Sequence, residues 1–239
     1  SRCLLPIDFA GGPEPFSLEP DADRAALSAW LSSQLTTTNS TAPIQSAGHR
    51  ITGGGVGAET AESTPLIGLD TFQSDPRFSS YDGSGYAAVV LDTGVDLDHP
   101  FFGPDLDLNQ VADRIVFNQD FATGGPNADD VNGHGSNVTS IVGSEDATFP
   151  GVAPGVDLIH LKVLDDAGFG NFGDVEAALQ WVVSNVATYN IATVNMSLSD
   201  GTNRQLAAGD FGIDDELAAL AALDVVVVSA AGNSFFNFG

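Results

Sequence analysis

A carboxylate, an imidazole and a side-chain amide lie at three places where buried elements of this 239-residue sequence are expected to end or begin. Asp92 follows the apolar run 89–91, and a carboxylate at the end of a buried strand is partly desolvated and needs a partner. His134 lies between two glycines, and Asn233 lies in a turn after the run 225–229. An imidazole base, a carboxylate that orients it and an amide that donates to an oxyanion together suit acyl transfer.

Each of these three residues also has a structural explanation that is common in proteins. Asp92 and Asn233 are typical turn residues, and a histidine with apolar neighbours is often part of the core. The spacing of Val138 and Ile141 after His134 predicts a helix with these three side chains on its inward face, so that the imidazole points towards a sheet. The chemical interpretation therefore depends on whether the fold brings the three residues together.

Strands and helices are predicted to alternate along most of the chain. Four short, nearly continuous apolar runs indicate strands that are buried on both faces, and Asp174 is the expected N-cap of the first helix. This alternation predicts an α/β fold, a parallel sheet flanked by helices on both faces, with functional groups at the carboxyl ends of the strands. The predicted strands are 86–91, 158–163, 192–198 and 225–229, and the predicted helices are 174–187 and 213–223.

Residues 1–64 lack this patterning. A polar run at 36–43 and a glycine-rich stretch at 53–57 are typical of linkers. We therefore expect an N-terminal extension or linker over 1–64 and the α/β domain over 65–239.

The sequence is strongly acidic, with 32 Asp and Glu against 7 Lys and Arg and a formal net charge of −25. Such charge disfavours binding to nucleic acid or to an anionic membrane, and no apolar run is long enough to cross a bilayer. This acidity is compatible with simple excess surface charge, with adaptation to a saline environment and with calcium binding by aspartates. The single cysteine, Cys3, excludes an intrachain disulfide.

Five short motifs, in this order, resemble the subtilisin-like serine proteases (subtilases, peptidase family S8), and the resemblance extends over about residues 64–239. They are LDTG with a following DHP, NGHGS, GVAP, VNMSLS and AAGN, at 91–94 with 98–100, 132–136, 151–154, 194–199 and 230–233. The resemblance implies that residues 65–239 form the N-terminal two-thirds of a subtilisin-like catalytic domain. It also implies a secreted or extracellular protein that acts on polypeptides.

The resemblance assigns roles to individual residues. Asp92 and His134 correspond to two members of the catalytic triad, and Asn233 corresponds to the donor that stabilises the oxyanion. The residues that pair with the substrate backbone correspond to Ser197, Leu198 and Ser199. One wall of the first specificity pocket corresponds to Ala230, Ala231 and Gly232.

The sequence departs from the family pattern in one major respect. The family's nucleophilic serine lies in a Gly-Thr-Ser motif beyond the oxyanion asparagine, and this sequence, which has no such motif, ends six residues after Asn233. We therefore expect a sheet that is incomplete at the C-terminus and a serine outside this chain, on a continuation or on a separate C-terminal piece. The 239-residue chain alone is then expected to be inactive. The alternative is a non-catalytic, peptide-binding pseudoprotease.

Metal binding is left open by the sequence. The expected chemistry requires no cofactor, but the loop before His134 contains Asp120, Asp129 and Asp130, and some subtilases bind structural calcium near this position. The alternative is that Asp130 caps the turn that follows it.

Overall fold

Five parallel strands form the central sheet of the computed structural model, which describes residues 43–46, 60–200, 211–230 and 232. Their order is β3-β4-β2-β6-β8, so β2 lies in the middle and places Asp92 at the centre of the sheet's carboxyl edge. The strands are β2 (Ala87–Asp92), β3 (Ile115–Asp120), β4 (Asp157–Lys162), β6 (Ile191–Met196) and β8 (Val226–Ser229).

The two border strands of this sheet are the ones that sequence patterns describe least well. The ends of the three inner strands and of β8 were predicted to within two residues. β3 was not predicted, because it carries Asn118 and Gln119 and is buried mainly at its two ends. The expectation that β8 is buried on both faces is wrong, since Val226 and Val228 are 60% and 50% exposed.

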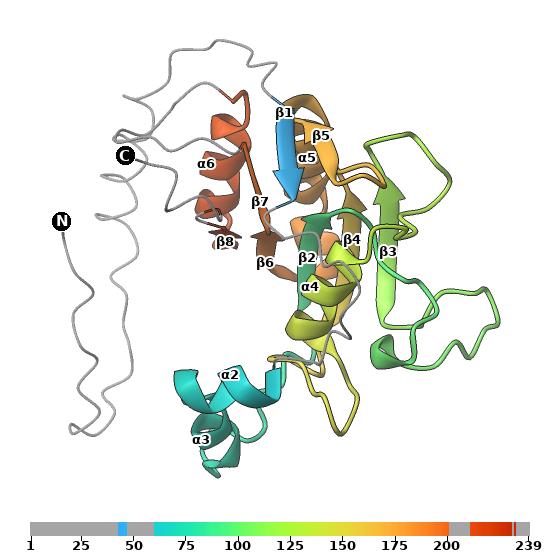
Figure 1. Cartoon of the computed structure of the whole chain (residues 1–239). Coiled ribbons are helices and arrows are strands. Elements are labelled where there is room, and N and C mark those ends of the chain that lie inside the picture. Colours follow the sequence, from blue (N-terminus) through green and yellow to red (C-terminus); the bar gives the residue numbers. More distant parts are fainter. Residues whose placement is uncertain (1–42, 47–59, 201–210, 231, 233–239) are drawn as a thin grey trace, which may run out of the picture. The chain divides into compact units, whose positions relative to one another are not determined.

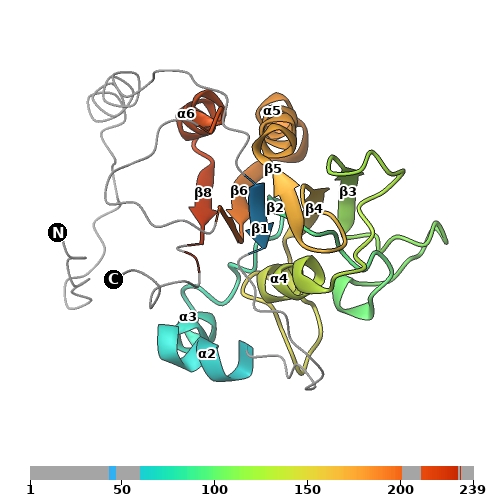
Figure 2. The same cartoon turned by 45° about the horizontal axis from the view of Figure 1, so that its top comes forward.

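Helices cover both faces of the sheet, which confirms the predicted fold class (Figure 1, Figure 2). The helices α5 (Phe172–Tyr189) and α6 (Asp214–Ala222) lie on one face, and α4 (His134–Gly143) lies on the other. Alternate residues of β2 divide between the two faces: Val89 packs in the core under α5 and α6, and Ala88 packs in the core of the opposite face.

The apolar face of α5 follows the predicted helical spacing, but the predicted start of the helix is wrong. The helix begins at Phe172, and its N-cap is Asn171, whose side-chain oxygen accepts a hydrogen bond from the backbone nitrogen of Asp174 at 3.1 Å. Asp174 lies in the first turn, where a negative charge is favourable. The buried aliphatic residues of the helix are Val175, Ala178, Leu179 and Val182.

The inward face of α4 differs from the predicted one. Its buried residues are Gly135, Thr139 and Gly143, whereas Ile141 is 41% exposed. These small residues let the helix backbone approach the sheet closely. The prediction that His134, Val138 and Ile141 form the inward face is therefore wrong, although His134 still contacts the end of β2.

A second, antiparallel sheet contains three short strands in the order β5-β1-β7. They are β5 (Phe169–Asn171), β1 (Pro43–Ser46) and β7 (Leu198–Ser199). The remaining elements are α2 (Thr60–Ile67), α3 (Leu69–Ser74) and the 3-10 helix η1 (Pro100–Phe102). β1 and the start of α2 are the described parts of the expected extension over 1–64. Within the described residues, no helix has the length and apolar character that a membrane crossing requires.

Candidate active site

The structure brings Asp92 and His134 into direct contact, although they are 42 residues apart. Asp92 is the last residue of β2 and is fully buried, and His134 is the first residue of α4. The imidazole Nδ1 lies 2.6 Å from Asp92 Oδ1, which also accepts a hydrogen bond from the backbone nitrogen of Thr93 at 2.8 Å. With its proton on Nδ1, the neutral imidazole presents Nε2 as an unprotonated base.

The electrostatics of this pair favour a proton on the imidazole. The hydrogen bond to Asp92 raises the pKa of His134, against the effect of burial. Burial raises the pKa of Asp92, and its Oδ2 atom is buried without a hydrogen-bond partner among the described residues. Because a carboxylate in this position stabilises an imidazolium more than an imidazole, His134 is suited to accept a proton during a reaction.

Two glycines allow the contact between Asp92 and His134. A Cβ atom on Gly135 would lie 2.1 Å from the carbonyl oxygen of Gly94 and 3.1 Å from Asp92 Cβ, so only glycine lets α4 come this close. Gly94 itself has a φ of +124°, and a Cβ there would lie 2.5 Å from the carbonyl oxygen of Asp129. Gly94 of LDTG and Gly135 of NGHGS are thus required by backbone packing at the site.

The residues expected to bind substrate lie at the ends of the neighbouring strands. Ser197, Leu198 and Ser199 follow β6, and the backbone nitrogen of Ala230, after β8, donates to the carbonyl oxygen of Met196 at 3.1 Å. A Cβ on Gly232 would lie 3.7 Å from Ser199 Oγ, which places Gly232 beside β7. Ala231 and Asn233 lie outside the described residues, so their roles stay predictions.

The strand edge that was expected to pair with substrate is paired with another segment of the chain. Gln45 and Ser46 of β1 are opposite Ser199 and Leu198 of β7, in antiparallel register. The other edge of β1 pairs with β5, where Ile44 is opposite Gly170. An extended segment therefore fits between β5 and β7 and hydrogen-bonds to both.

Two of the three acidic side chains in the loop before His134 accept hydrogen bonds from protein donors. Asp120 accepts hydrogen bonds from the Thr123 hydroxyl and from the backbone nitrogens of Thr123 and Gly125. The Asp130 carboxylate caps the following turn, because Gly133 and Ser136 donate to it. Calcium binding in this loop stays a prediction. Among the described residues, the acidic side chains whose oxygens converge within 4.8 Å are instead Asp105, Asp107 and Asp113.

Two residues near the site were missed by the sequence interpretation. Thr93 is fully buried next to Asp92, and Lys162 is 3% exposed at the end of β4, where it is opposite Asp92 in register. Lys162 is the single lysine of the sequence and ends a buried apolar run. A lysine in that position needs several hydrogen-bond acceptors, and this signal was present in the sequence.

Comparison with known proteins identifies the family of this chain. Residues 83–237 match the model of the subtilase family, Peptidase S8. The chain is 36% identical over 184 residues to an extracellular serine proteinase of Thermus sp. (strain Rt41A), an alignment that covers 74% of this chain and 40% of that protein. It is 30% identical over 172 residues to subtilisin DY of Bacillus licheniformis, covering 71% of this chain and 54% of that protein.

A solved structure shows the same fold. The crystal structure of a cold adapted subtilisin-like serine proteinase superposes with a TM-score of 0.50 at 29% sequence identity, covering 70% of this chain and 56% of that chain. The parallel sheet with helices on both faces is the α/β architecture that this chain shares with that subtilisin-like serine proteinase. This chain belongs to the subtilase family.

The chain spans about a third to a half of the length of the curated relatives it matches. It covers 31% of alkaline serine exoprotease A of Vibrio alginolyticus, to which it is 31% identical over 185 residues. The activity and substrates of the complete protein are therefore matters for proposal.

Proposed function

We propose that the complete protein is a subtilisin-like serine endopeptidase that hydrolyses peptide bonds, with Asp92 and His134 as two of its catalytic residues. The observation that carries this proposal is the 2.6 Å contact between His134 Nδ1 and buried Asp92, which leaves Nε2 available as a base. The nucleophilic serine is expected outside this sequence, which has no Gly-Thr-Ser motif. The 239-residue chain alone is then expected to be inactive.

The proposed reaction uses this pair twice. His134 Nε2 takes the proton from the serine hydroxyl while the serine oxygen attacks the carbonyl carbon of the peptide bond. The carbonyl oxygen becomes an oxyanion, to which the amide of Asn233 donates a hydrogen bond. The imidazolium, held by Asp92, then protonates the leaving amine as the C–N bond breaks. Water repeats these steps, which releases the acyl group as an acid and restores the serine.

The proposed substrate is a polypeptide in extended conformation. The pairing of β1 with both β5 and β7 supports this proposal, because a strand in that place forms backbone hydrogen bonds on two sides without regard to its sequence. Small residues at Ala230, Ala231 and Gly232 would leave room for a large side chain in the first specificity pocket. A relative named an extracellular proteinase and the net charge of −25 support a secreted protein, suited to a saline environment.

The proposal is tested with a fluorophosphonate that labels reactive serines in the complete protein. We expect labelling of the wild type and its loss in His134→Ala. His99→Ala is the matched control, because His99 is outside the proposed catalytic pair and its Nδ1 accepts a hydrogen bond from the backbone nitrogen of Phe101. This substitution should leave labelling intact. A complete protein that binds extended peptides but is never labelled would instead be a peptide-binding pseudoprotease.

A further inference from the structure

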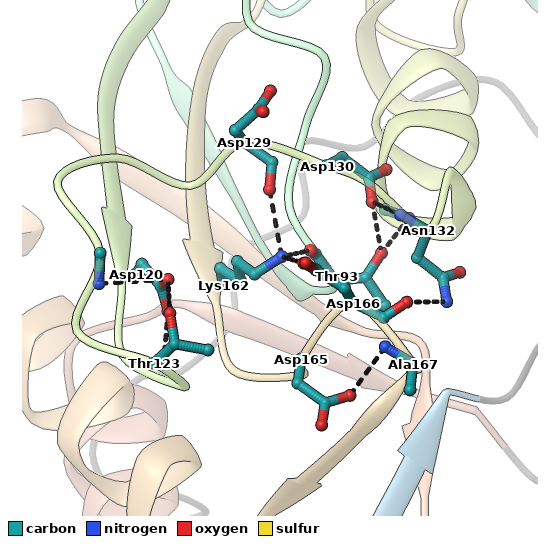
Figure 3. Close-up of polar contacts among 12 residues, drawn as sticks. Thr93, Asp120, Thr123, Asp129, Asp130, Asn132, Lys162, Asp165, Asp166 and Ala167 are labelled. Carbon is teal, nitrogen blue, oxygen red and sulfur yellow. Dashed lines mark hydrogen bonds and ion pairs between the residues drawn. The ribbon is translucent and has the colours of Figure 1, made fainter.

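Three backbone segments meet next to the Asp92–His134 pair, and one buried lysine is hydrogen-bonded to all of them (Figure 3). Lys162 Nζ donates to the carbonyl oxygen of Thr93 at 2.6 Å, to that of Asp129 at 3.1 Å and to Asp166 Oδ1 at 2.7 Å. An ammonium group has three protons, so each proton has an acceptor, one on each segment. A displacement of any one segment would leave a buried charge without a full set of partners.

The carboxylate of Asp130 connects two of these segments a second time. Its Oδ1 accepts hydrogen bonds from Thr93 Oγ1 at 3.0 Å and from the backbone nitrogen of Gly133 at 2.9 Å. Its Oδ2 accepts from the backbone nitrogen and the hydroxyl of Ser136, at 2.8 and 2.6 Å. These bonds lower the pKa of Asp130 despite its partial burial, so it is a carboxylate at neutral pH.

Thr93 is the residue on which both charged groups converge. Its carbonyl accepts from Lys162, its hydroxyl donates to Asp130, and the same hydroxyl accepts from the backbone nitrogen of Gly135 at 2.9 Å. Thr93 directly follows Asp92, and Gly135 directly follows His134. The hydroxyl of Thr93 therefore joins the residues next to the two members of the pair.

We propose that Lys162 and Asp130, acting through Thr93, are positioning residues that fix the distance between Asp92 and His134. The kinetic part of this inference rests on the proposed function. Among the described residues, none of the three is hydrogen-bonded to the imidazole, so their effect is on the geometry of the pair. The geometry keeps the imidazole proton on Nδ1 and Nε2 free to act as the base.

The main test compares Thr93→Val with Thr93→Ser in the complete protein, because neither substitution changes a charge. Valine keeps the shape of threonine but lacks the hydroxyl, and serine keeps the hydroxyl. We expect Thr93→Val to lower kcat for a peptide substrate by about 10- to 100-fold with KM little changed. It should also shift the proton resonance of His134 Nδ1–H. Thr93→Ser should restore both.

A purely structural role would give a different result. Thr93→Val would then lower the melting temperature while kcat and the Nδ1–H resonance kept their wild-type values, and this outcome would overturn the inference. If the wild-type protein has no peptidase activity, the proposed function fails, but the resonance of His134 still decides whether Thr93 positions the pair.

A second test uses charge and remains available if Thr93→Val does not fold. The charges that act on His134 are those of Asp92 and Asp130, and the charges of Asp130 and Lys162 act on the nearby His160. Because Asp130 helps to raise the pKa of His134, Asp130→Asn should lower the midpoint of the His134 titration measured by NMR. The matched control is Asp129→Asn, which removes the same charge from the adjacent, exposed side chain and keeps the backbone carbonyl that binds Lys162. Equal shifts in both variants would overturn the role of Asp130.

Discussion

The two faces of the central sheet are built from different kinds of residue, and the active-site pair lies on only one of them. Under α5 and α6 the core is mainly aliphatic and includes Val89 and Leu179. Under α4 apolar residues such as Leu158 are joined by small and polar ones: Thr139 of the helix bonds to the buried His160 of β4, 3.1 Å away. Asp92 and Lys162 belong to this second face, because side chains alternate along each strand.

Because of this difference, the two faces should contribute differently to the stability of the fold and to the position of His134. Aliphatic packing is non-directional, so the face under α5 and α6 stabilises the fold but tolerates small shifts. Hydrogen bonds and close backbone contacts depend on direction and distance, so the face under α4 fixes where His134 lies. Substitutions on the first face should change the free energy of unfolding with little effect on His134, and substitutions on the second should affect His134 directly.

The largest loss of stability is expected from Leu179→Ala on the aliphatic face. Leu179 is fully buried in α5, and a leucine-to-alanine change in a core costs about 2–5 kcal/mol. Chemical denaturation measures this loss. The titration midpoint of His134 should stay at its wild-type value, and a shift of that midpoint would contradict the separation between the two faces.

On the other face, Gly135→Ala is expected to cost about 1–3 kcal/mol and also to disturb the pair. The new Cβ would lie 2.1 Å from the Gly94 carbonyl oxygen, and backbone on both sides would have to move. The Nδ1–H resonance of His134 should therefore shift or disappear.

Gly143→Ala, in the same helix, is the matched control for this prediction. Its Cβ would meet side-chain atoms of Leu158 and Val156 at 2.9 and 3.1 Å, and side chains can adjust. We expect it to cost less and to leave His134 unchanged. Equal effects of the two substitutions on the His134 resonance would show that α4 moves as a rigid unit.

The buried His160 should make the polar face sensitive to acid. The Thr139 hydroxyl donates to the carbonyl oxygen of Gly135, so it accepts from His160 Nδ1–H, and His160 Nε2 is left buried without a partner among the described residues. Burial lowers the pKa of His160 to about 3, with Asp130 opposing the shift and Lys162 adding to it. The unfolded chain therefore takes up a proton near pH 6.5 that the folded chain takes up only near pH 3.

The sign of the effect follows from this difference in bound protons. Between these two pH values the unfolded state binds more protons, so this group destabilises the fold as pH falls, by up to about 1.4 kcal/mol per pH unit. Denaturation of the wild type and of His160→Leu at several pH values from 7 to 4 measures it. The stability of the variant relative to the wild type should improve steadily towards pH 4. A difference that is constant with pH would contradict the buried, neutral state of His160.

The helix packing on one face was predictable from the sequence and that on the other was not, for a physical reason. The face of α5 was predicted because large aliphatic residues recur at helical spacing. The inward face of α4 consists of Gly135, Thr139 and Gly143, which carry no apolar signal, so the exposed Ile141 was taken for part of it. Close packing of small residues is a property of two surfaces together, and one sequence segment does not encode it.

The candidate site was predicted in outline but not in its supporting contacts. Asp92 and His134 were identified from motifs, and the fold brings them together. Asp130 was identified as a ligand or a cap, but its link to Thr93 joins residues 37 positions apart and depends on the fold. The partner of β7 was expected to be a substrate strand, and no local signal at 43–46 indicates that β1 pairs there.

The smallest effect is expected at the start of α5, where the structure corrects the predicted N-cap. Asn171 Oδ1 accepts from the backbone nitrogen of Asp174, and Asn171 Nδ2 donates to Asp174 Oδ2 at 2.6 Å. Loss of an N-cap costs about 1 kcal/mol, so Asn171→Ala should lower the free energy of unfolding by that amount, and Asn171→Ser should restore most of it. Asp174→Ala removes a first-turn charge, which is worth about 0.3–1 kcal/mol and weakens with added salt. If Asp174 were the cap, its substitution would cost more than that of Asn171 and would not depend on salt. Because both residues lie at the start of α5, on the opposite side of the sheet from α4, neither substitution should shift the titration of His134.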